Sequence, residues 1–184
     1  VRDLAFRYRP GAPLEEALAL SARFTDLGFS RRGPVPGLDP LSGRVRAQGG
    51  VFTLELDPGP VEVDATHLFR SPLAARLGAT VRARRGSEGW HLDVASLALR
   101  NPDLRLDLAG SVTLPARGGP PHLSLVGEFG DGRVENISTY LPVAVMADDA
   151  ERWLDRGLVG GRLERGSFLF HGNAGDFPFD DGSG

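Results

Sequence analysis

A chain of 184 residues is long enough for one domain with a real core, and its 41% hydrophobic and 24% charged residues are typical of a globular protein. The net charge of -3 gives no sign of nucleic-acid binding, and the lack of cysteine excludes disulfides, thiolate metal sites and cysteine nucleophiles. No stretch approaches the roughly 18 apolar residues of a membrane-spanning helix, and no signal peptide is recognisable. Because both ends look cut, we expect a segment of a longer protein.

The first third of the chain alternates between apolar and polar residues, which indicates β-strands. We expect an edge strand over residues 4–8 and another strand from Leu18 to Thr25, although Glu15-Glu16-Ala17 also fits the start of a helix. Prolines and glycines predict a loop over residues 30–40 and a turn at Asp57-Pro58-Gly59-Pro60. The remaining strands expected here cover residues 43–47, 51–57 and 61–65.

The middle of the chain continues the alternation. A short helical turn is expected within residues 68–77, followed by a strand over residues 79–84. The strand expected over residues 90–99 changes phase near Ala95-Ser96, which predicts a β-bulge.

The clearest strand runs from Leu104 to Leu114, with every second position apolar or glycine and with Gly110 expected to bend it. Together with a strand over residues 123–129, these segments predict an all-β fold, an antiparallel meander over residues 1–139 with one apolar face. Such a face either folds on itself, as in a closed sandwich, or stays open as a curved, taco-like groove. Residues 140–184 then supply a Tyr-Leu-Pro turn, a short helix and a returning strand.

The helix is expected over residues 148–156, where acidic residues lead, Arg156 lies near the end and Gly157 stops it. Ala150, Trp153 and Leu154 form an apolar stripe, and we expect Trp153 to pin the helix to the sheet.

No catalytic, metal or cofactor site is expected. The acidic pairs fit a helix cap and a solvated tail, and no serine lies in a nucleophile elbow. The histidines lie on separate strands or loops without the spacing of metal ligands, at positions His67, His91, His122 and His171.

Several short motifs resemble the YhdP-type proteins of the AsmA-like superfamily. The most specific are Tyr140-Leu141-Pro142, Met146, Trp153-Leu154, Gly160-Gly161, Gly166, Phe168, Gly172 and Phe177-Pro178-Phe179; upstream lie Pro36-Gly37, Leu41-Ser42-Gly43, Phe52, Leu54, Leu68-Phe69, Gly89-Trp90 and Leu97-Ala98-Leu99-Arg100-Asn101. The resemblance covers nearly the whole chain, which stops where that family continues.

The resemblance implies a Gram-negative envelope protein anchored in the inner membrane outside this segment. It implies a periplasmic location, a β-groove that carries phospholipid towards the outer membrane, and neighbouring repeats joined through strand edges. Arg105 and Arg133 are either headgroup contacts at the rim or solvated surface. The residues expected to line the groove are Phe52, Leu54, Leu56, Val61, Val63, Leu92, Val94, Leu104, Leu106, Leu108, Val112, Leu123, Leu125, Phe129, Phe168 and Phe170.

Two other functions remain open from the sequence. A scaffold or assembly factor for outer-membrane proteins would use exposed strand edges to pair with a client. A carbohydrate-active β-sandwich would need convergent carboxylates and exposed aromatic residues, and the sequence indicates neither.

Overall fold

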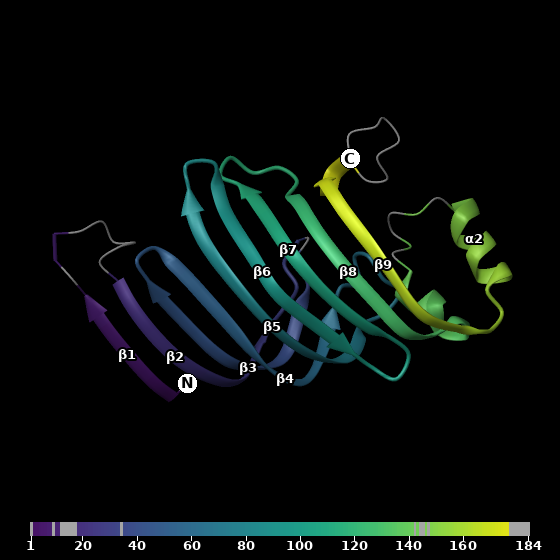
Figure 1. Ribbon diagram of the computed structural model, residues 1–184, viewed down its shortest axis with the longest axis horizontal. Coiled ribbons are helices and arrows are strands. Elements are labelled where there is room, and N and C mark those ends of the chain that lie inside the picture. The colour runs from purple at the N-terminus through teal and green to yellow at the C-terminus, as the bar shows by residue number, and fades with distance from the viewer. Residues whose placement is uncertain are drawn as a thin grey trace.

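The computed structural model describes residues 2–8, 10–11, 18–33, 35–141, 143, 146 and 148–176. Their nine strands form one antiparallel sheet in sequence order, and β1 and β9 lie at opposite edges, so the sheet is not closed (Figure 1). The predicted meander with one short α-helix is therefore confirmed. The elements are β1 Arg2–Tyr8, β2 Leu18–Phe29, β3 Gly37–Gln48, β4 Val51–Asp64, β5 Leu73–Gly86, β6 Gly89–Arg100, β7 Arg105–Pro115, β8 His122–Arg133, the 3₁₀ helix η1 Val134–Tyr140, α2 Asp148–Gly157, β9 Arg162–Asn173 and the 3₁₀ helix η3 Ala174–Asp176.

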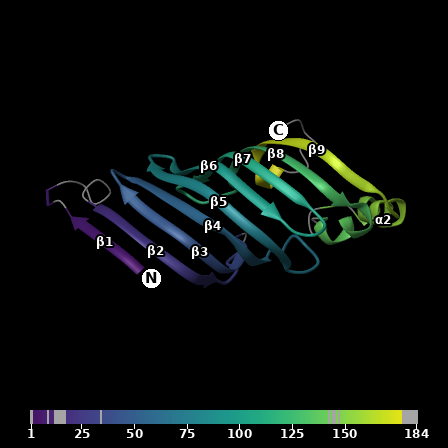
Figure 2. The same ribbon diagram turned by 60° about the horizontal axis from the view of Figure 1, so that its bottom comes forward.

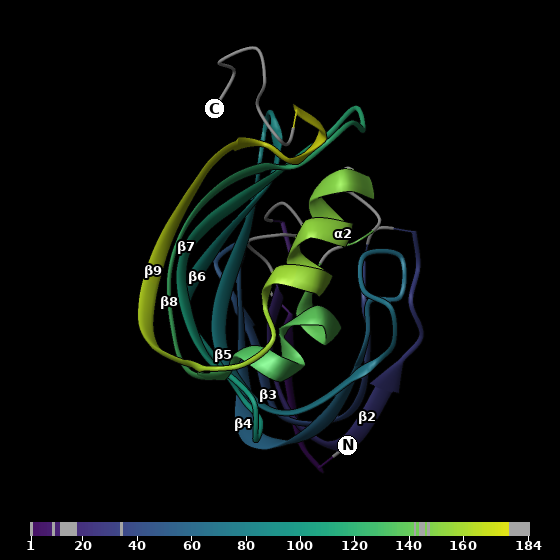
Figure 3. The same ribbon diagram turned by 90° about the vertical axis from the view of Figure 1, so that its right-hand side faces the viewer.

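The sheet is strongly curved. Figure 2 shows the strands side by side from β1 to β9, with α2 near the β9 end. In the end-on view of Figure 3 the sheet bends round and η1 lies on its concave side, while α2 lies at the β9 end of the sheet, beyond β9 in Figure 1.

Aligned irregularities explain the bend across β2, β3 and β4. Phe24 pairs with Gly43, and Gly43 pairs with Leu56; a register shift begins next to each of them. An extra residue in one strand bends it and increases its twist, so three neighbouring shifts fold the sheet along one line. The turn predicted at residues 57–60 is wrong, because β4 runs through Pro58 and Gly59 as part of this bend. Proline and glycine are tolerated at such a bulge without ending the strand.

Other local predictions fare differently. The bulge near Ala95-Ser96 is confirmed, because Thr80 pairs with Ser96 and Val81 with Val94, leaving Ala95 over. The helical turn predicted within residues 68–77 is earlier and shorter: the amides of Leu68 and Phe69 both donate to the carbonyl of Ala65, at 2.8 and 3.0 Å. The loop predicted over residues 30–40 ends where β3 begins, and the helix alternative before Leu18 lies outside the described residues.

The best-buried part of the molecule lies in the concavity beside the bend. Its cluster consists of Phe24, Leu41, Val61, Ala75 and Leu77, all less than 10% exposed. Among the described residues, no large side chain is less than 2% exposed. The sheet therefore has a packed floor at β2–β5 and no second layer that covers the whole apolar face.

Candidate functional site: an apolar trough

Strand register brings the predicted groove residues to one face. In an antiparallel sheet, directly paired residues point to the same side. One row joins Leu54, Val81, Val94, Gly110, Leu125 and Phe170, and the next joins Phe52, Ala83, Leu92, Val112 and Leu123. Parallel rows pass through Leu56 and Leu108 and through Leu106 and Phe129, while Val61 and Val63 continue the face in β4. We call this concave apolar face the trough.

The trough side chains are neither in a packed core nor fully in water. Of the sixteen predicted residues, Val61 and Val94 are buried and Phe168 is exposed, while the other thirteen are half-buried. A packed core would hide such residues almost completely. The arrangement indicates an open apolar channel whose walls shelter one another.

Glycines set the shape of the trough at its C-terminal end. The rings of Phe129 and Phe168 stack with centroids 6.5 Å apart. Phe168 lies over Gly127, and Phe129 lies over Gly166; a Cβ on either glycine would come within 2.5 Å of the facing ring. The two glycines thus make room for the rings to lie along the trough.

A cavity of about 280 Å³ lies where η1 approaches the trough. Leu104, Leu106 and Phe129 form its sheet side, and Val134, Tyr140 and Leu141 contribute from η1 and the residue after it. Leu163 of β9, Asp103, Gly132 and Arg133 complete the lining. The cavity is mainly apolar with charged groups at its margin, so it suits a chain-like apolar group whose end remains polar.

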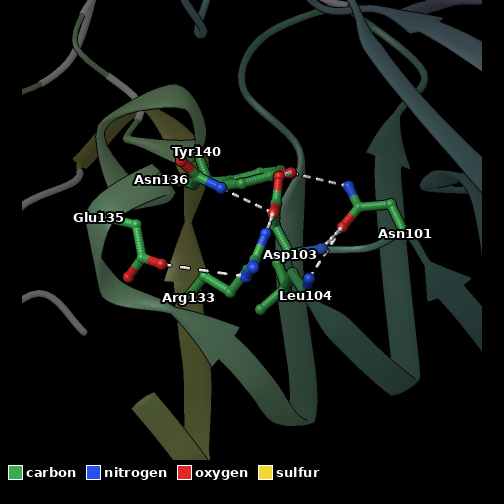
Figure 4. Close-up of polar contacts among 7 residues, drawn as sticks. All are labelled: Asn101, Asp103, Leu104, Arg133, Glu135, Asn136 and Tyr140. Atoms are coloured by element: carbon green, nitrogen blue, oxygen red, sulfur yellow. Dashed lines mark hydrogen bonds and ion pairs between the residues drawn. The ribbon is translucent and has the colours of Figure 1, made fainter. Parts of the chain in front are cut away.

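A polar network fixes η1 beside this cavity (Figure 4). The Tyr140 hydroxyl donates to Asp103 Oδ2 at 3.1 Å and accepts from Asn101 Nδ2 at 2.9 Å. Asn136 Nδ2 donates to Asp103 Oδ1 at 2.7 Å, and Arg133 Nη1 lies 3.8 Å from the same oxygen. Burial, followed by the bond to Asp103, raises the pKa of Tyr140.

Arg70 joins the β4–β5 loop to α2. Its guanidinium donates to Glu151 Oε1 at 2.5 Å and to Asp155 Oδ2 at 2.7 Å, with a longer contact of 3.5 Å to the carbonyl of Ser138 in η1. The bonds to Asp155 and then Glu151 raise the pKa of Arg70. The Arg70 side chain therefore contacts both η1 and α2.

The expected role of Trp153 is wrong, because its side chain is 70% exposed. Among the described side chains of α2, Glu151 and Leu154 are half-buried, and Leu158 follows the helix on the same side. Arg70 pairs with Glu151 and Asp155. The ion pairs of Glu151 and Asp155 with Arg70 set the orientation of α2, and Trp153 of the predicted apolar stripe lies on the exposed side of the helix. The side chain of Ala150 lies outside the described part of the structure.

The remaining candidates separate in space. Arg133 borders the cavity, whereas Arg105 points to the convex face, opposite Leu106, with its Nε 3.6 Å from Asp131. The convex face also brings His122 and His171 together, with ring centroids 5.1 Å apart, although they are far apart in sequence. Within the described ranges, no three His, Cys, Asp or Glu side chains are placed to hold a metal ion.

The fold and its trough define a class of protein: an open antiparallel sheet with a continuous apolar concave face. The sequence model of the YhdP protein family matches residues 1–184, so the chain belongs to the YhdP family. No curated protein and no solved structure matches the chain. Membership of this family suggests an envelope-associated protein with a role related to lipid transport or scaffolding rather than an enzyme. In the described residues, no helix has the length and apolar character needed to cross a membrane.

Proposed function

We propose that this chain is a segment of a lipid-transfer bridge that carries phospholipid along the trough between the inner and outer membranes. The observation that carries the proposal is the apolar face, which runs from β1 to β9 and which no layer of described residues covers as a whole. Family membership supports the same role.

The mechanism is passive sheltering of acyl chains. Each methylene moved from water to an apolar surface contributes about 0.8 kcal/mol. The polar margin at Arg133 and Asp103 leaves the headgroup in water while the chain lies on Leu104 and Leu106. Because successive rows of the trough present similar side chains, a lipid can move along it without one deep binding site that would stop it.

The strand edges supply the partners that the proposal needs. β1 and β9 each pair with a single neighbouring strand, so among the described residues each leaves one backbone edge unpaired. We propose that neighbouring repeats of a longer periplasmic chain continue the sheet there, with the inner-membrane anchor outside this segment. Unpaired strand edges readily accept another strand.

Organic extraction of the purified protein, followed by mass spectrometry, tests the proposal. Co-purified phospholipid in amounts near one or more per chain is expected. A matched comparison uses Leu106→Asp, in the trough, and Ala109→Asp, on the other face of β7; only the first should lose lipid. Absence of lipid from wild-type protein, or equal lipid in both variants, would contradict a lipid-carrying trough.

A scaffold function is the second candidate, because the edge strand β1 exposes Leu4, Phe6 and Tyr8 by 66, 66 and 50%. Such an edge could add a client strand, with the apolar side chains giving specificity. A lipid-free protein that binds β-strand peptides through β1 would favour this function.

A further inference from the structure

The two halves of the trough have different side walls. Beyond the bend, β2–β5 fold back and wall the trough with strand ends, including Leu41, Val61 and Ala75. In the other half, β6 ends at Arg100 and a short turn leads directly to β7, so no strand ends fold back there. In this turn Asn101 Oδ1 accepts from the amides of Asp103 and Leu104 at 3.0 and 2.8 Å. There η1 occupies the concave side instead, and α2 lies at the β9 end of the trough (Figures 1 and 3).

The α2 helix is held by a side chain from a distant part of the sequence. Arg70 lies 81 and 85 residues before its partners Glu151 and Asp155, so the contact joins distant parts of the chain. Its own loop is fixed at its start, because Asp64 Oδ1 accepts from both the hydroxyl and the amide of Thr66, at 2.8 and 3.2 Å. Those bonds lower the pKa of Asp64, so the carboxylate stays charged at neutral pH.

The ion pairs that hold α2 to Arg70 are weak enough to break. A ten-residue helix is marginal by itself in water. The Arg70, Glu151 and Asp155 side chains are 35, 30 and 36% exposed, so salt screens their attraction. The outer face of α2, with Trp153 exposed, adds no apolar anchor. By contrast, η1 is tied to the sheet through Tyr140 and Asp103 in a less exposed network.

We propose that α2 is a movable wall at the β9 end of the trough, held shut by Arg70, and that releasing Arg70 opens this end of the trough to acyl chains. The lipid part rests on the proposed function, whereas the movement can be measured without lipid. Opening would leave the sheet in place, and η1 would lose only the 3.5 Å contact of Arg70 with the Ser138 carbonyl, because the bond from Tyr140 to Asp103 still holds it.

The movement is tested by the distance between spin labels at Ser71→Cys and Arg156→Cys, in a chain that has no native cysteine. The unaltered Arg70 should give a narrow distribution, and Arg70→Gln a longer and broader one. Arg82→Gln is the matched control, because Arg82 lies 3.8 Å from Asp93 on the convex face. A charge exchange, Arg70→Glu with Asp155→Arg, should narrow the distribution again. An unchanged distribution in Arg70→Gln would overturn the inference.

The consequence for lipid is tested with the same cysteine pair joined by a cleavable bis-maleimide. Uptake of a fluorescent phosphatidylethanolamine from vesicles of phosphatidylethanolamine and phosphatidylglycerol should slow several-fold when α2 is locked and recover after cleavage. Arg70→Gln should speed uptake. Equal rates of lipid uptake for locked and free protein would refute α2 as a gate. If the wild-type chain takes up no lipid at all, the proposed function fails, and the label distances alone decide whether α2 moves.

Discussion

The contrast between Leu77 and Leu106 tests whether the apolar face is open. Leu77 pairs with Leu99, and Leu99 pairs with Leu106, so the two leucines lie in one cross-strand row of the same face. Leu77 is 6% exposed within the floor cluster, whereas Leu106 is half-buried and lines the cavity under η1. The same substitution at both positions should therefore have unequal effects.

The difference can be worked out from burial. Leu→Ala removes three methylene-sized groups, worth about 2.4 kcal/mol when fully buried. At Leu77 a new cavity adds to this, for a total of about 3–5 kcal/mol. At Leu106 the side chain already faces open space, so only part of the transfer term is lost, about 1 kcal/mol. The gap of about 2–4 kcal/mol corresponds to roughly 4–16 °C in Tm for a chain of this size.

Urea unfolding of both alanine variants measures the gap as a change in midpoint at constant slope. Leu106→Asp extends the test, because a carboxylate in an open trough stays hydrated, whereas one in a packed core is prohibitive. We expect a folded Leu106→Asp protein. If Leu106→Ala costs as much as Leu77→Ala, and Leu106→Asp fails to fold, the concave face at β7 is ordinary core and the trough is refuted there.

Three further predictions concern the sheet and the elements beside it. Trp153→Ala should leave the urea midpoint within about 0.5 kcal/mol of wild type, since the side chain is exposed; a loss near 3 kcal/mol would show a buried role. Tyr140→Phe should cost about 1 kcal/mol at neutral pH. The raised pKa of Tyr140 means that the protonated hydroxyl stabilises the fold below pH of about 10, a contribution lost as pH rises further, so the variant should show a flatter alkaline stability profile. Gly110→Val should cost about 3 kcal/mol or more, because Gly110 has φ +139° and a Cβ there would lie 2.1 Å from the Ser124 carbonyl oxygen. Circular dichroism melting in parallel with Gly86→Ala, where the added carbon would lie 3.9 Å from the Gly89 carbonyl oxygen in an ordinary contact, checks it.

Period-two alternation made most of the sheet predictable. It places alternate residues on one face whatever the partners are, so sixteen scattered positions could be assigned to one side before any pairing was known. The phase change at Ala95-Ser96 was likewise a local signal of a bulge. Residues 57–60 misled because turn and bulge use the same residue types, and only the pairing of Gly59 with Leu77 distinguishes them.

The parts that could not be predicted depend on contacts between distant residues. A short helix offers more than one face, and Trp153 looked like an anchor because it is large and apolar. The orientation of α2 depends on the ion pair of Glu151 with Arg70, which lies 81 residues earlier, and no local sequence pattern predicts that pair. The cavity under η1 depends in the same way on Tyr140 reaching Asp103, 37 residues earlier.

The sequential order of the strands gives the trough a length scale. Strands in a sheet lie about 4.8 Å apart, so nine strands cover roughly 38 Å measured across them. Adding one hairpin lengthens this by about 10 Å and restores the direction of the chain, so the apolar side chains stay on the same face. The length of the trough is thus set by the number of hairpins, while strand length sets only its depth. A chain built in this way can be lengthened or shortened by duplication or loss of hairpins, without redesign of its apolar face.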